Sequence, residues 1–549
     1  MTYVITQSCC NDASCVEVCP VDCIHPAPEE PDFATAEMLY IHPDECIDCG
    51  ACVDACPVGA VHADLEVPDH LSDYLQVNAD YFAWVGDIPA PMPITSGGSR
   101  VDDQAEPLRV AVVGSGPAGW FVADELAGTR RAKVEVTLLD RLATPHGLVR
   151  HGVAPDHLDT KQVTQMFEDF TRRQPISLRL NVEVGRDVTH DELLEHHHCV
   201  VYATGASEGR ALGIVGEELR GSYAAADFVN WYNGHPDWVN LDPPLAHERA
   251  VIIGNGNVAL DVARLLLVGP DELTTSSDMV PHAVDALATS GIDEVVIVGR
   301  RGPEHAAFTS AELLALVNHP GIDVVVEPEE LTSLPSEEPD VRTAATFAAH
   351  RKAELLRRIA GGSNGGPKRL VLRFGLTPEE ITGDGRVESL TLSRTAGNAD
   401  PVTLPTGLVL RATGYRSVPT AGVPFDQAAG RYAHESGRVT DPESGAVVPR
   451  TYVTGWAKRG ATGVIGTNRA CAVETVAAIL DDYVGGRLPE QVGDASGLDG
   501  LLVERGISIV DLTSWKRLDE HERASGKDAG RPRLKVADRD QQLKIASGN

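Results

Sequence analysis

LRVAVVGSGPAGWFVADELAG, residues 108–128, is the stretch of sequence that decides the fold. An apolar strand pattern leads into Gly114, Gly116 and Gly119 in the spacing GxGxxG, and a helical pattern follows. Glycines at these positions permit a tight turn and bring a pyrophosphate close to the amides of the helix N-terminus. The next strand pattern, VEVTLLD, ends on Asp140, which is either a ribose-binding carboxylate or a solvated one. The stretch predicts a doubly wound α/β domain for a dinucleotide, and the acid favours FAD or NAD over NADP.

A second strand, turn and helix occupies ERAVIIGNGNVALDVARLLL, residues 248–267. Its turn carries Gly254, Gly256 and Ala259 in the positions of the three glycines. The next strand pattern, IDEVVIVGRR, ends on Arg300 and Arg301. Paired guanidinium groups suit the 2′-phosphate of NADPH, although arginines at a strand end are also common on protein surfaces. Two dinucleotide sites imply two cofactors.

Cysteines cluster at the start of the chain, because nine of the 11 lie within the first 56 residues. CIDCGACVDACP (46–57) has the C-x2-C-x2-C-x3-C-P spacing of bacterial ferredoxins, in which three cysteines hold one iron–sulfur cluster and the fourth holds the other. Zinc ribbons separate their cysteine pairs by longer loops and match this spacing poorly. CCNDASCVEVCP (9–20) repeats the pattern with Asp12 in place of the second cysteine.

Cross-ligation divides these residues into two sites. The complete set predicts a 4Fe-4S cluster on Cys19, Cys46, Cys49 and Cys52. The other set, Cys9, Cys15 and Cys56, suits a 3Fe-4S cluster. A labile 4Fe-4S form would need Asp12 as a weak fourth ligand, because a carboxylate is harder than a thiolate. Cys10 and Cys23 fall outside the pattern, either as buried structural thiols or as alternative ligands.

The chain is strongly acidic, with 80 acidic against 47 basic residues and a formal net charge of -33. This balance opposes binding to nucleic acid or to an anionic membrane. There is no signal-peptide pattern at the N-terminus, and no apolar run reaches the roughly 18 residues of a membrane span. We therefore expect a soluble, cytoplasmic protein whose cysteines bind metal. The helical segment 342–362 carries Arg351, Lys352, Arg357 and Arg358. These cations either dock an acidic ferredoxin surface or form an ordinary solvated face.

Residues 1–85 resemble seven-iron ferredoxins, through the two cysteine runs, MLYIHPDEC and LQVNADYFA. They depart from that family in a shorter first spacing and in the insertion HPAPEEPDFATAE after Cys23. Residues 108–490 resemble the adrenodoxin reductase family of ferredoxin–NADP reductases. The motifs are VVGSGPAG, GLVRHGVAPDH, GNGNVALDVAR, VGRRGP with FTSAEL, and TGWAKRGATGVIGTN. The whole chain is thus similar to the fused ferredoxin/ferredoxin–NADP reductases of mycobacterial type.

The resemblance implies two sets of binding residues. FAD would be held by Ala118, Asp140, Leu148 and Val184, with Trp456 and the backbone of Gly463, Val464 and Ile465 beside its isoalloxazine ring. NADPH would contact Asn255, Gly256, Asn257, Val258, Arg300, Arg301, Glu312 and Gly463. Asp140 stands where many relatives have Glu, an exchange that preserves the ribose contact. Trp456 is otherwise a core aromatic residue, and Asp156 with His157 either relays protons to the flavin or braces its loop.

The expected fold is a small α+β ferredoxin-like domain followed by two doubly wound, Rossmann-type α/β domains, one inserted into the other. We predict a two-cluster domain at 1–85, a linker at 86–107, an FAD domain at 108–212 and 401–490, an NADP domain at 213–400, and a C-terminal extension at 491–549.

The resemblance implies a ferredoxin–NADP reductase that passes electrons from NADPH through FAD to its own clusters. They would continue to an external acceptor protein, a ferredoxin or a cytochrome P450, and the hydride step needs no catalytic acid, base or nucleophile. Two alternatives come from other classes. One is an electron-relay subunit of a larger complex, and the other is an iron or oxygen sensor built on the three-thiolate cluster.

Overall fold

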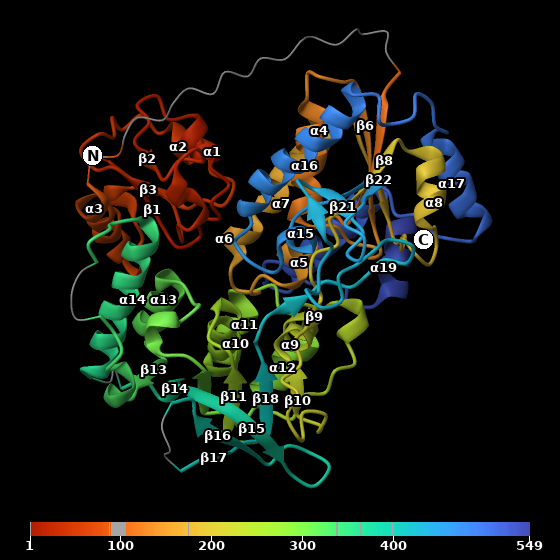
Figure 1. The fold of residues 1–549 in the computed structure, drawn as a ribbon. Helices are drawn as coiled ribbons and strands as arrows, with labels where there is room; N and C mark the ends of the chain where they lie inside the picture. The colour runs from red at the N-terminus through yellow and green to blue at the C-terminus, as the bar shows by residue number, and fades with distance from the viewer. Residues whose placement is uncertain are drawn as a thin grey trace.

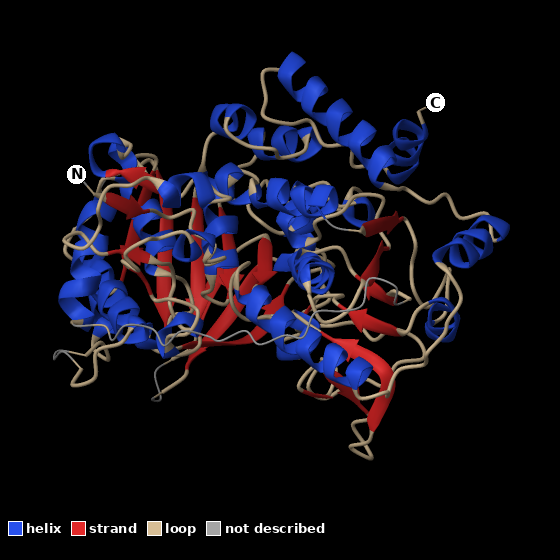
Figure 2. Cartoon of the chain, turned by 90° about the horizontal axis from the view of Figure 1, so that it is seen from above, coloured by secondary structure: helices blue, strands red, loops and turns tan. Residues whose placement is uncertain are grey.

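The computed structural model describes residues 2–86, 88, 106–173, 175–335, 339–362, 365–396 and 400–548. The predicted linker at 86–107 lies almost entirely outside these residues. Figure 1 follows the chain from red at the N-terminus to blue at the C-terminus, and Figure 2 shows two groups of strands surrounded by helices. Among the described residues, no helix has both the length and the apolar character needed to span a bilayer.

The cysteine region, residues 2–86, consists of two small antiparallel sheets packed on a helix. Asn78 on this helix accepts hydrogen bonds from the amides of Ile5 at 3.2 Å and Ile41 at 3.0 Å, so that one side chain joins both sheets. Tyr40 and Tyr81 stack with ring centroids 4.0 Å apart beneath them. The elements are β1 (Tyr3–Ile5), α1 (Ser14–Glu17), β2 (Ile24–His25), β3 (Tyr40–Ile41), α2 (Ala51–Ala55), β4 (Val61–Ala63) and α3 (Asp73–Val85).

A seven-stranded sheet carries the first glycine-rich turn, in the strand order β20-β21-β22-β8-β5-β6-β7. Its strands from β22 to β7 are parallel. The strands are β5 (Leu108–Val113), β6 (Val134–Asp140), β7 (Ile176–Leu180), β8 (Cys199–Tyr202), β20 (His434–Glu435), β21 (Arg438–Thr440) and β22 (Val447–Val453). Alternate residues of β5 face opposite ways, as a strand requires. Val110 and Val112 enter one apolar cluster, and Ala111 and Val113 enter the other.

Helices cover both faces of this sheet, as a doubly wound fold predicts. One face packs against α4 (Pro117–Gly128) and α16 (Thr467–Val484), and the other against α8 (His190–His196) and α17 (Ala495–Glu504). Figure 1 shows these two pairs on opposite sides of β8 and β22. Shorter helices follow the strands, namely α5 (Leu148–His151), α6 (Leu158–Lys161), α7 (Val163–Arg173) and α15 (Trp456–Arg459).

A six-stranded parallel sheet carries the second glycine-rich turn, in the order β10-β18-β11-β12-β14-β13. Its strands are β10 (Ser222–Ala224), β11 (Arg249–Ile253), β12 (Glu294–Gly299), β13 (Ile322–Val326), β14 (Lys368–Phe374) and β18 (Leu408–Arg411). The helices are α9 (Ala225–Tyr232), α10 (Asn257–Leu267), α11 (Pro270–Thr275), α12 (Pro281–Ala288), α13 (Ser310–Asn318) and α14 (Ala344–Ala360).

This second sheet differs from the predicted doubly wound fold. Val296 and Val298 face an apolar cluster that contains Leu376, Leu390 and other strand residues but, among the described residues, no helix residue. An antiparallel sheet of β15 (Leu376–Thr382), β16 (Ser389–Arg394) and β17 (Val402–Pro405) supplies this cover. Apolar residues alternate with polar ones along β16, which is the pattern of a strand with one buried face and not of a crossover helix.

One predicted boundary is also wrong. The sequence predicts that 401–490 belongs to the first nucleotide domain, yet β18 pairs in parallel with β11 inside the six-stranded sheet. Its four residues, LVLR, have three buried apolar side chains, and this pattern suits the centre of either sheet. A two-stranded pair of β9 (Glu208–Gly209) and β19 (Tyr415–Arg416) then marks where the chain crosses between the sheets.

The C-terminal extension forms α17, α18 (Leu512–Asp528) and α19 (Arg539–Ser547). Val510 forms a bridge to Leu180 at the end of β7. Lys535 is buried and lies 3.0 Å from Asp278, between α11 and α12. The extension thus contacts the structures built on both nucleotide-binding sheets.

The cysteine region docks on α13 and α14. The predicted basic segment contributes to this contact, since Arg351 lies 3.4 Å from Asp80 and Lys352 lies 3.4 Å from Glu37. The insertion after Cys23 also takes part, because its Asp32 accepts a hydrogen bond from the amide of Ala344 at the start of α14. Its residues therefore position the cysteine region on the rest of the chain.

Replacing Glu37 by Gln is expected to loosen this contact by about 1–3 kcal/mol, because Glu37 Oε2 accepts from both the amide (2.8 Å) and the hydroxyl (2.7 Å) of Ser310. The amides at the start of α13 should then exchange with deuterium faster, as measured by mass spectrometry of that peptide. Glu29, an exposed residue of the same insertion, provides the control Glu29→Gln. Equal protection of α13 in the two variants would contradict the docking role of Glu37.

Candidate functional site

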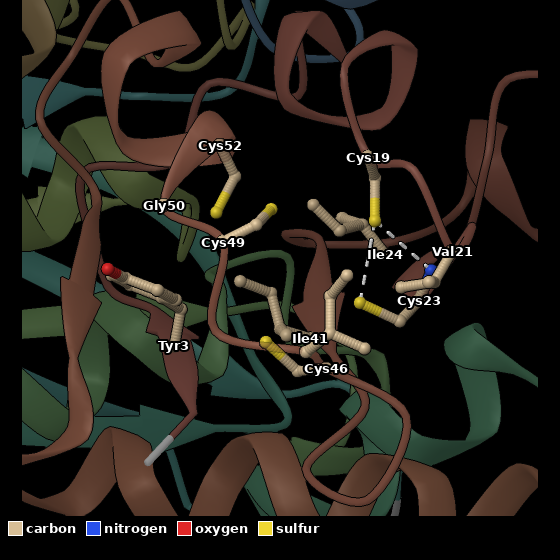
Figure 3. Close-up of a pocket in the computed structure, with 11 residues that line it drawn as sticks. Tyr3, Cys19, Val21, Cys23, Ile24, Ile41, Cys46, Cys49, Gly50 and Cys52 are labelled. Carbon is tan, nitrogen blue, oxygen red and sulfur yellow. Dashed lines mark hydrogen bonds between the residues drawn. The ribbon is translucent and has the colours of Figure 1, made fainter.

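Four cysteines converge on one pocket in the cysteine region. Figure 3 shows Cys46, Cys49 and Cys52 on one side of it and Cys19 on the other. The structure thus brings together the four cysteines that the cross-ligation rule assigns to one cluster. Cys23 lines the same cavity, with its Sγ 3.5 Å from Cys19 Sγ and its amide donating to that sulfur at 3.4 Å. We call Cys19, Cys46, Cys49 and Cys52 the four-cysteine site.

The three-cysteine site comprises Cys9, Cys15 and Cys56. Asp12, the candidate weak ligand, is buried with both carboxylate oxygens engaged. Its Oδ2 accepts from the amide of Ser14 at 3.2 Å and from the Ser14 hydroxyl, and its Oδ1 lies 3.7 Å from Cys10 Sγ. Asp12 therefore serves the turn that starts α1, and Cys10 packs beside it as a buried thiol.

The negative charge of the cysteine region favours the binding of a cation. Residues 1–85 contain sixteen carboxylates and no lysine or arginine. Burial raises the pKa of Cys9 to about 12 and that of Cys52 to about 11, since a buried thiolate is costly without a compensating charge. A bound metal supplies that charge and deprotonates the thiols that ligate it. The donor set and the cavity therefore fit iron–sulfur clusters.

The first glycine-rich turn lies between β5 and α4. Gly114 has a φ of 108°, and a Cβ on Gly119 would lie 1.9 Å from Gly114 O, so neither position accepts a side chain without a shift. Asp140, at the end of the neighbouring strand, accepts from the amide (2.8 Å) and hydroxyl (2.6 Å) of Ser115 in this turn. The carboxylate is thus placed beside the turn, where the sequence predicts a ribose contact.

The other predicted FAD residues gather around the start of α4. A Cβ on Gly147 would lie 2.9 Å from Gly116 Cα, which places Leu148 next to the turn. A Cβ on Gly455 would lie 2.4 Å from Ala118 Cβ, which places Trp456 next to the start of α4. The same Cβ would lie 3.3 Å from Asn468 Oδ1, and Asn468 donates to Ile465 O at 2.8 Å, so the segment that ends at Ile465 lies nearby. Val184 follows Val182, whose amide donates to Asp140 O at 2.8 Å.

A buried polar group supports a ligand at this place. Thr454 is fully buried at the end of β22, and its hydroxyl has no hydrogen-bond partner among the described residues. Its amide donates to Tyr202 O at 3.0 Å, so it lies where β22 and β8 end beside the glycine-rich turn. A free hydroxyl beside a glycine cradle fits a dinucleotide such as FAD.

The second glycine-rich turn lies between β11 and α10. Gly254 donates to Val298 O at 2.8 Å, which sets this turn next to the end of β12 and to Arg300 and Arg301. Both arginines are exposed, and no carboxylate among the described residues pairs with either guanidinium. Asn255 packs against Gly299. Asn257 and Val258 are the first two residues of α10, and Asn257 Oδ1 accepts from the amide of Thr309 at 2.8 Å. Thr309 caps α13, whose first turn carries Glu312.

A charged cluster forms where the three parts of the chain meet. His157 Nε2 lies 3.9 Å from Glu312 Oε2 and 3.8 Å from Asp261 Oδ1. Gln7 of the cysteine region donates to Glu312 Oε2 at 3.2 Å. Burial raises the pKa of Glu312, so this carboxyl is the better candidate in the cluster for holding a proton.

Asp156 has a different role from the predicted proton relay. Arg264 binds both of its oxygens, at 2.7 and 2.9 Å. Burial alone would raise the pKa of Asp156, but the attraction of Arg264 lowers it to about 2. Asp156 is therefore ionised at neutral pH, which favours the alternative that it braces the loop.

Three members of this cluster were missed from the sequence. Asp261 and Arg264 follow Asn257 by four and seven residues, on the same face of α10, and this spacing could have identified them. Gln7 carries no such signal, because its contact with Glu312 depends on docking between segments 305 residues apart.

Comparison with known proteins agrees with both parts of this arrangement. Residues 39–62 match the family model described as 4Fe-4S binding domain, and residues 108–325 match that of pyridine nucleotide-disulphide oxidoreductase. A protein of Mycobacterium tuberculosis H37Rv named "Probable ferredoxin/ferredoxin--NADP reductase" is 44% identical over 557 residues, which cover 100% of this chain and 95% of the relative. The Mycobacterium leprae protein of that name is 43% identical over 555 residues and covers 100% and 98%.

A solved structure described as M. tuberculosis FprA in complex with NADPH matches with a TM-score of 0.75 and 40% identity, over 81% of this chain and 100% of that one. These matches confirm the resemblance inferred from the motifs. The chain therefore belongs to the family of fused ferredoxin/ferredoxin–NADP reductases.

Proposed function

We propose that this protein is an NADPH–ferredoxin oxidoreductase that passes electrons from NADPH to its own iron–sulfur clusters and on to an external acceptor in the cytoplasm. The observation that carries the proposal is the charged cluster around His157 and Glu312. It joins α10, the first turn of α13, the loop before α6 and Gln7 of the cysteine region, so that the parts carrying both nucleotide sites and the cysteines belong to one assembly.

The seven-stranded sheet would bind FAD and the six-stranded sheet NADP(H). Bound FAD would accept a hydride from NADPH and release the electrons singly to the clusters. Gly114, Gly116 and Gly119 would admit the FAD pyrophosphate, and Asp140 its ribose. Arg300 and Arg301 would hold the 2′-phosphate of NADPH. Glu312 and His157, whose side chains lie 3.9 Å apart, would bind or release a proton nearby.

The four-cysteine site would hold a 4Fe-4S cluster and the three-cysteine site a 3Fe-4S cluster. The hydrogen bonds of Asp12 to Ser14 support the three-thiolate form, since a carboxylate already bound to the α1 turn is a poor iron ligand. The external acceptor would be a ferredoxin or a cytochrome P450. The uniform negative charge of residues 1–85 favours an acceptor with a basic docking surface.

Anaerobic titration of the purified protein with NADPH tests this function, followed by flavin absorbance and low-temperature EPR. We expect the flavin to bleach and the EPR signals of the clusters to change in proportion, with little response to NADH. A flavin that bleaches while both clusters keep their initial signals would contradict internal transfer and favour a sensor. A flavin that does not respond to NADPH would contradict the reductase itself.

A further inference from the structure

The cysteine region touches the predicted flavin site through one loop. The amide of Gly466, which directly follows Gly463–Ile465, donates to Cys10 O at 2.8 Å. A Cβ on Gly466 would lie 1.8 Å from Asn11 O, so the two backbones are in direct contact. Cys10 and Asn11 belong to the loop that connects Cys9 to Cys15. The three-cysteine site therefore lies next to the segment Gly463–Ile465, which we expect beside the isoalloxazine ring.

Arg469 holds this contact from the first turns of α16. Its NH1 donates to Asp12 O at 3.1 Å, and its NH2 lies 2.7 Å from Glu17 Oε1. Glu17 ends α1, which carries Cys15. Arg469 thus binds both ends of the short stretch that supplies the buried thiol of the three-cysteine site.

The four-cysteine site takes no part in this contact. All residues that line its cavity belong to positions 3–52, so no described residue of the nucleotide-binding parts reaches it. Cys49 is exposed, and Ile47 beside it is 59% exposed. The carboxylates of Asp22, Asp44, Glu45 and Asp48 are exposed around it.

We propose, on the basis of the function proposed above, that electrons leave the flavin site through the loop between Cys9 and Cys15 and enter the three-cysteine site. They then reach the external acceptor from the four-cysteine site. Oxidation of each NADPH to NADP⁺ releases two electrons and one proton. The electrons move singly through the two sites in this order, and two one-electron acceptors are reduced for each NADPH. The order follows from contact, because the rate of electron transfer falls steeply with distance.

A charge reversal tests the route. Arg469→Glu places two carboxylates against each other and removes the bond to Asp12 O, and it should slow reduction of the three-cysteine site by about 10-fold or more in stopped-flow and freeze-quench EPR. The rate of flavin bleaching by NADPH should stay unchanged. The double variant Glu17→Lys with Arg469→Glu restores opposite charges and should recover most of the rate. An unchanged rate in Arg469→Glu would overturn the proposal.

Removal of one cluster tests the order. In Cys46→Ala, NADPH should still reduce the three-cysteine site, while reduction of an external cytochrome c should fall by about 10-fold or more, since only the outer relay is lost. Iron content and dithionite reduction show that the remaining cluster is intact. If Cys46→Ala abolishes reduction of the three-cysteine site while flavin still bleaches, the order is reversed. Failure of flavin bleaching in the unaltered protein would instead contradict the proposed function.

Discussion

Replacing Arg300 and Arg301 together by Gln is expected to weaken NADPH binding by about 10²- to 10⁴-fold, because each hydrogen-bonded pair with a charged phosphate contributes about 1.5–3 kcal/mol. Both side chains are exposed at the end of β12, next to the turn at Gly254. No described carboxylate competes for them, so they are available to a 2′-phosphate. NADH lacks this phosphate, and its binding should hardly change. Titration of the flavin protein with each nucleotide measures the ratio.

Arg369 provides a matched control for this pair. It lies on β14, where it pairs with residue 294 at the opposite end of β12, and its guanidinium is 3.2 Å from Glu294. Arg369→Gln should leave both nucleotides unaffected. An equal loss of NADPH and NADH in the Arg300 and Arg301 variant would show that the two residues support the turn and do not recognise the phosphate.

The parts of the site that the sequence predicted depend on local chemistry. A residue such as Gly119 admits no side chain because its Cβ position meets Gly114 O, and a turn of this kind leaves a fixed spacing in the sequence. The cysteine spacing has the same origin, since ligands around one cluster must sit on one short turn and helix. The structure accordingly gathers Cys46, Cys49 and Cys52 with the distant Cys19 at one cavity.

The parts that could not be predicted depend on contacts between distant segments. Gln7 contacts Glu312, and Gly466 contacts Asn11, only because the cysteine region docks on the rest of the chain. The apolar pattern of a helix predicts which of its faces is buried, but it does not predict which distant segment docks on it. The alternation along β16 predicts a strand but does not say which sheet face that strand covers. The order of the two cysteine sites along an electron path is therefore a property of docking and is absent from the motifs.

The C-terminal extension shows how a segment without a motif can still support the predicted flavin site. Glu522 on α18 is fully buried, and its carboxylate accepts from Arg150 at 2.6 and 2.9 Å, from Arg533 at 2.7 Å and from the amide of Val536 at 2.8 Å. Arg150 belongs to α5, the helix that begins at Leu148 beside the first glycine-rich turn. The extension therefore fixes a helix that we expect to contact FAD.

Glu522→Gln is expected to lower the free energy of unfolding by about 3–5 kcal/mol, because it leaves the buried guanidinium of Arg150 without its counter-charge. Urea unfolding followed by circular dichroism measures this loss, and flavin release should occur at lower urea than in the unaltered protein. Glu520→Gln is the matched control, since Glu520 is exposed on the same helix. A loss of equal size in both variants would mean that α18 contributes only through its apolar face.

The pH dependence of this loss gives an independent check. Burial alone would raise the pKa of Glu522, but Arg150 and Arg533 lower it below the ordinary value of 4.5. A carboxyl with a depressed pKa in the folded state stabilises the fold fully above the unfolded pKa and loses that contribution as the pH falls. The difference in stability between the unaltered protein and Glu522→Gln should therefore be constant above about pH 5 and shrink below about pH 4.5. A difference that persists undiminished in acid would mean that Glu522 acts through its shape and its neutral hydrogen bonds, because the ionic contribution disappears once the carboxyl is protonated.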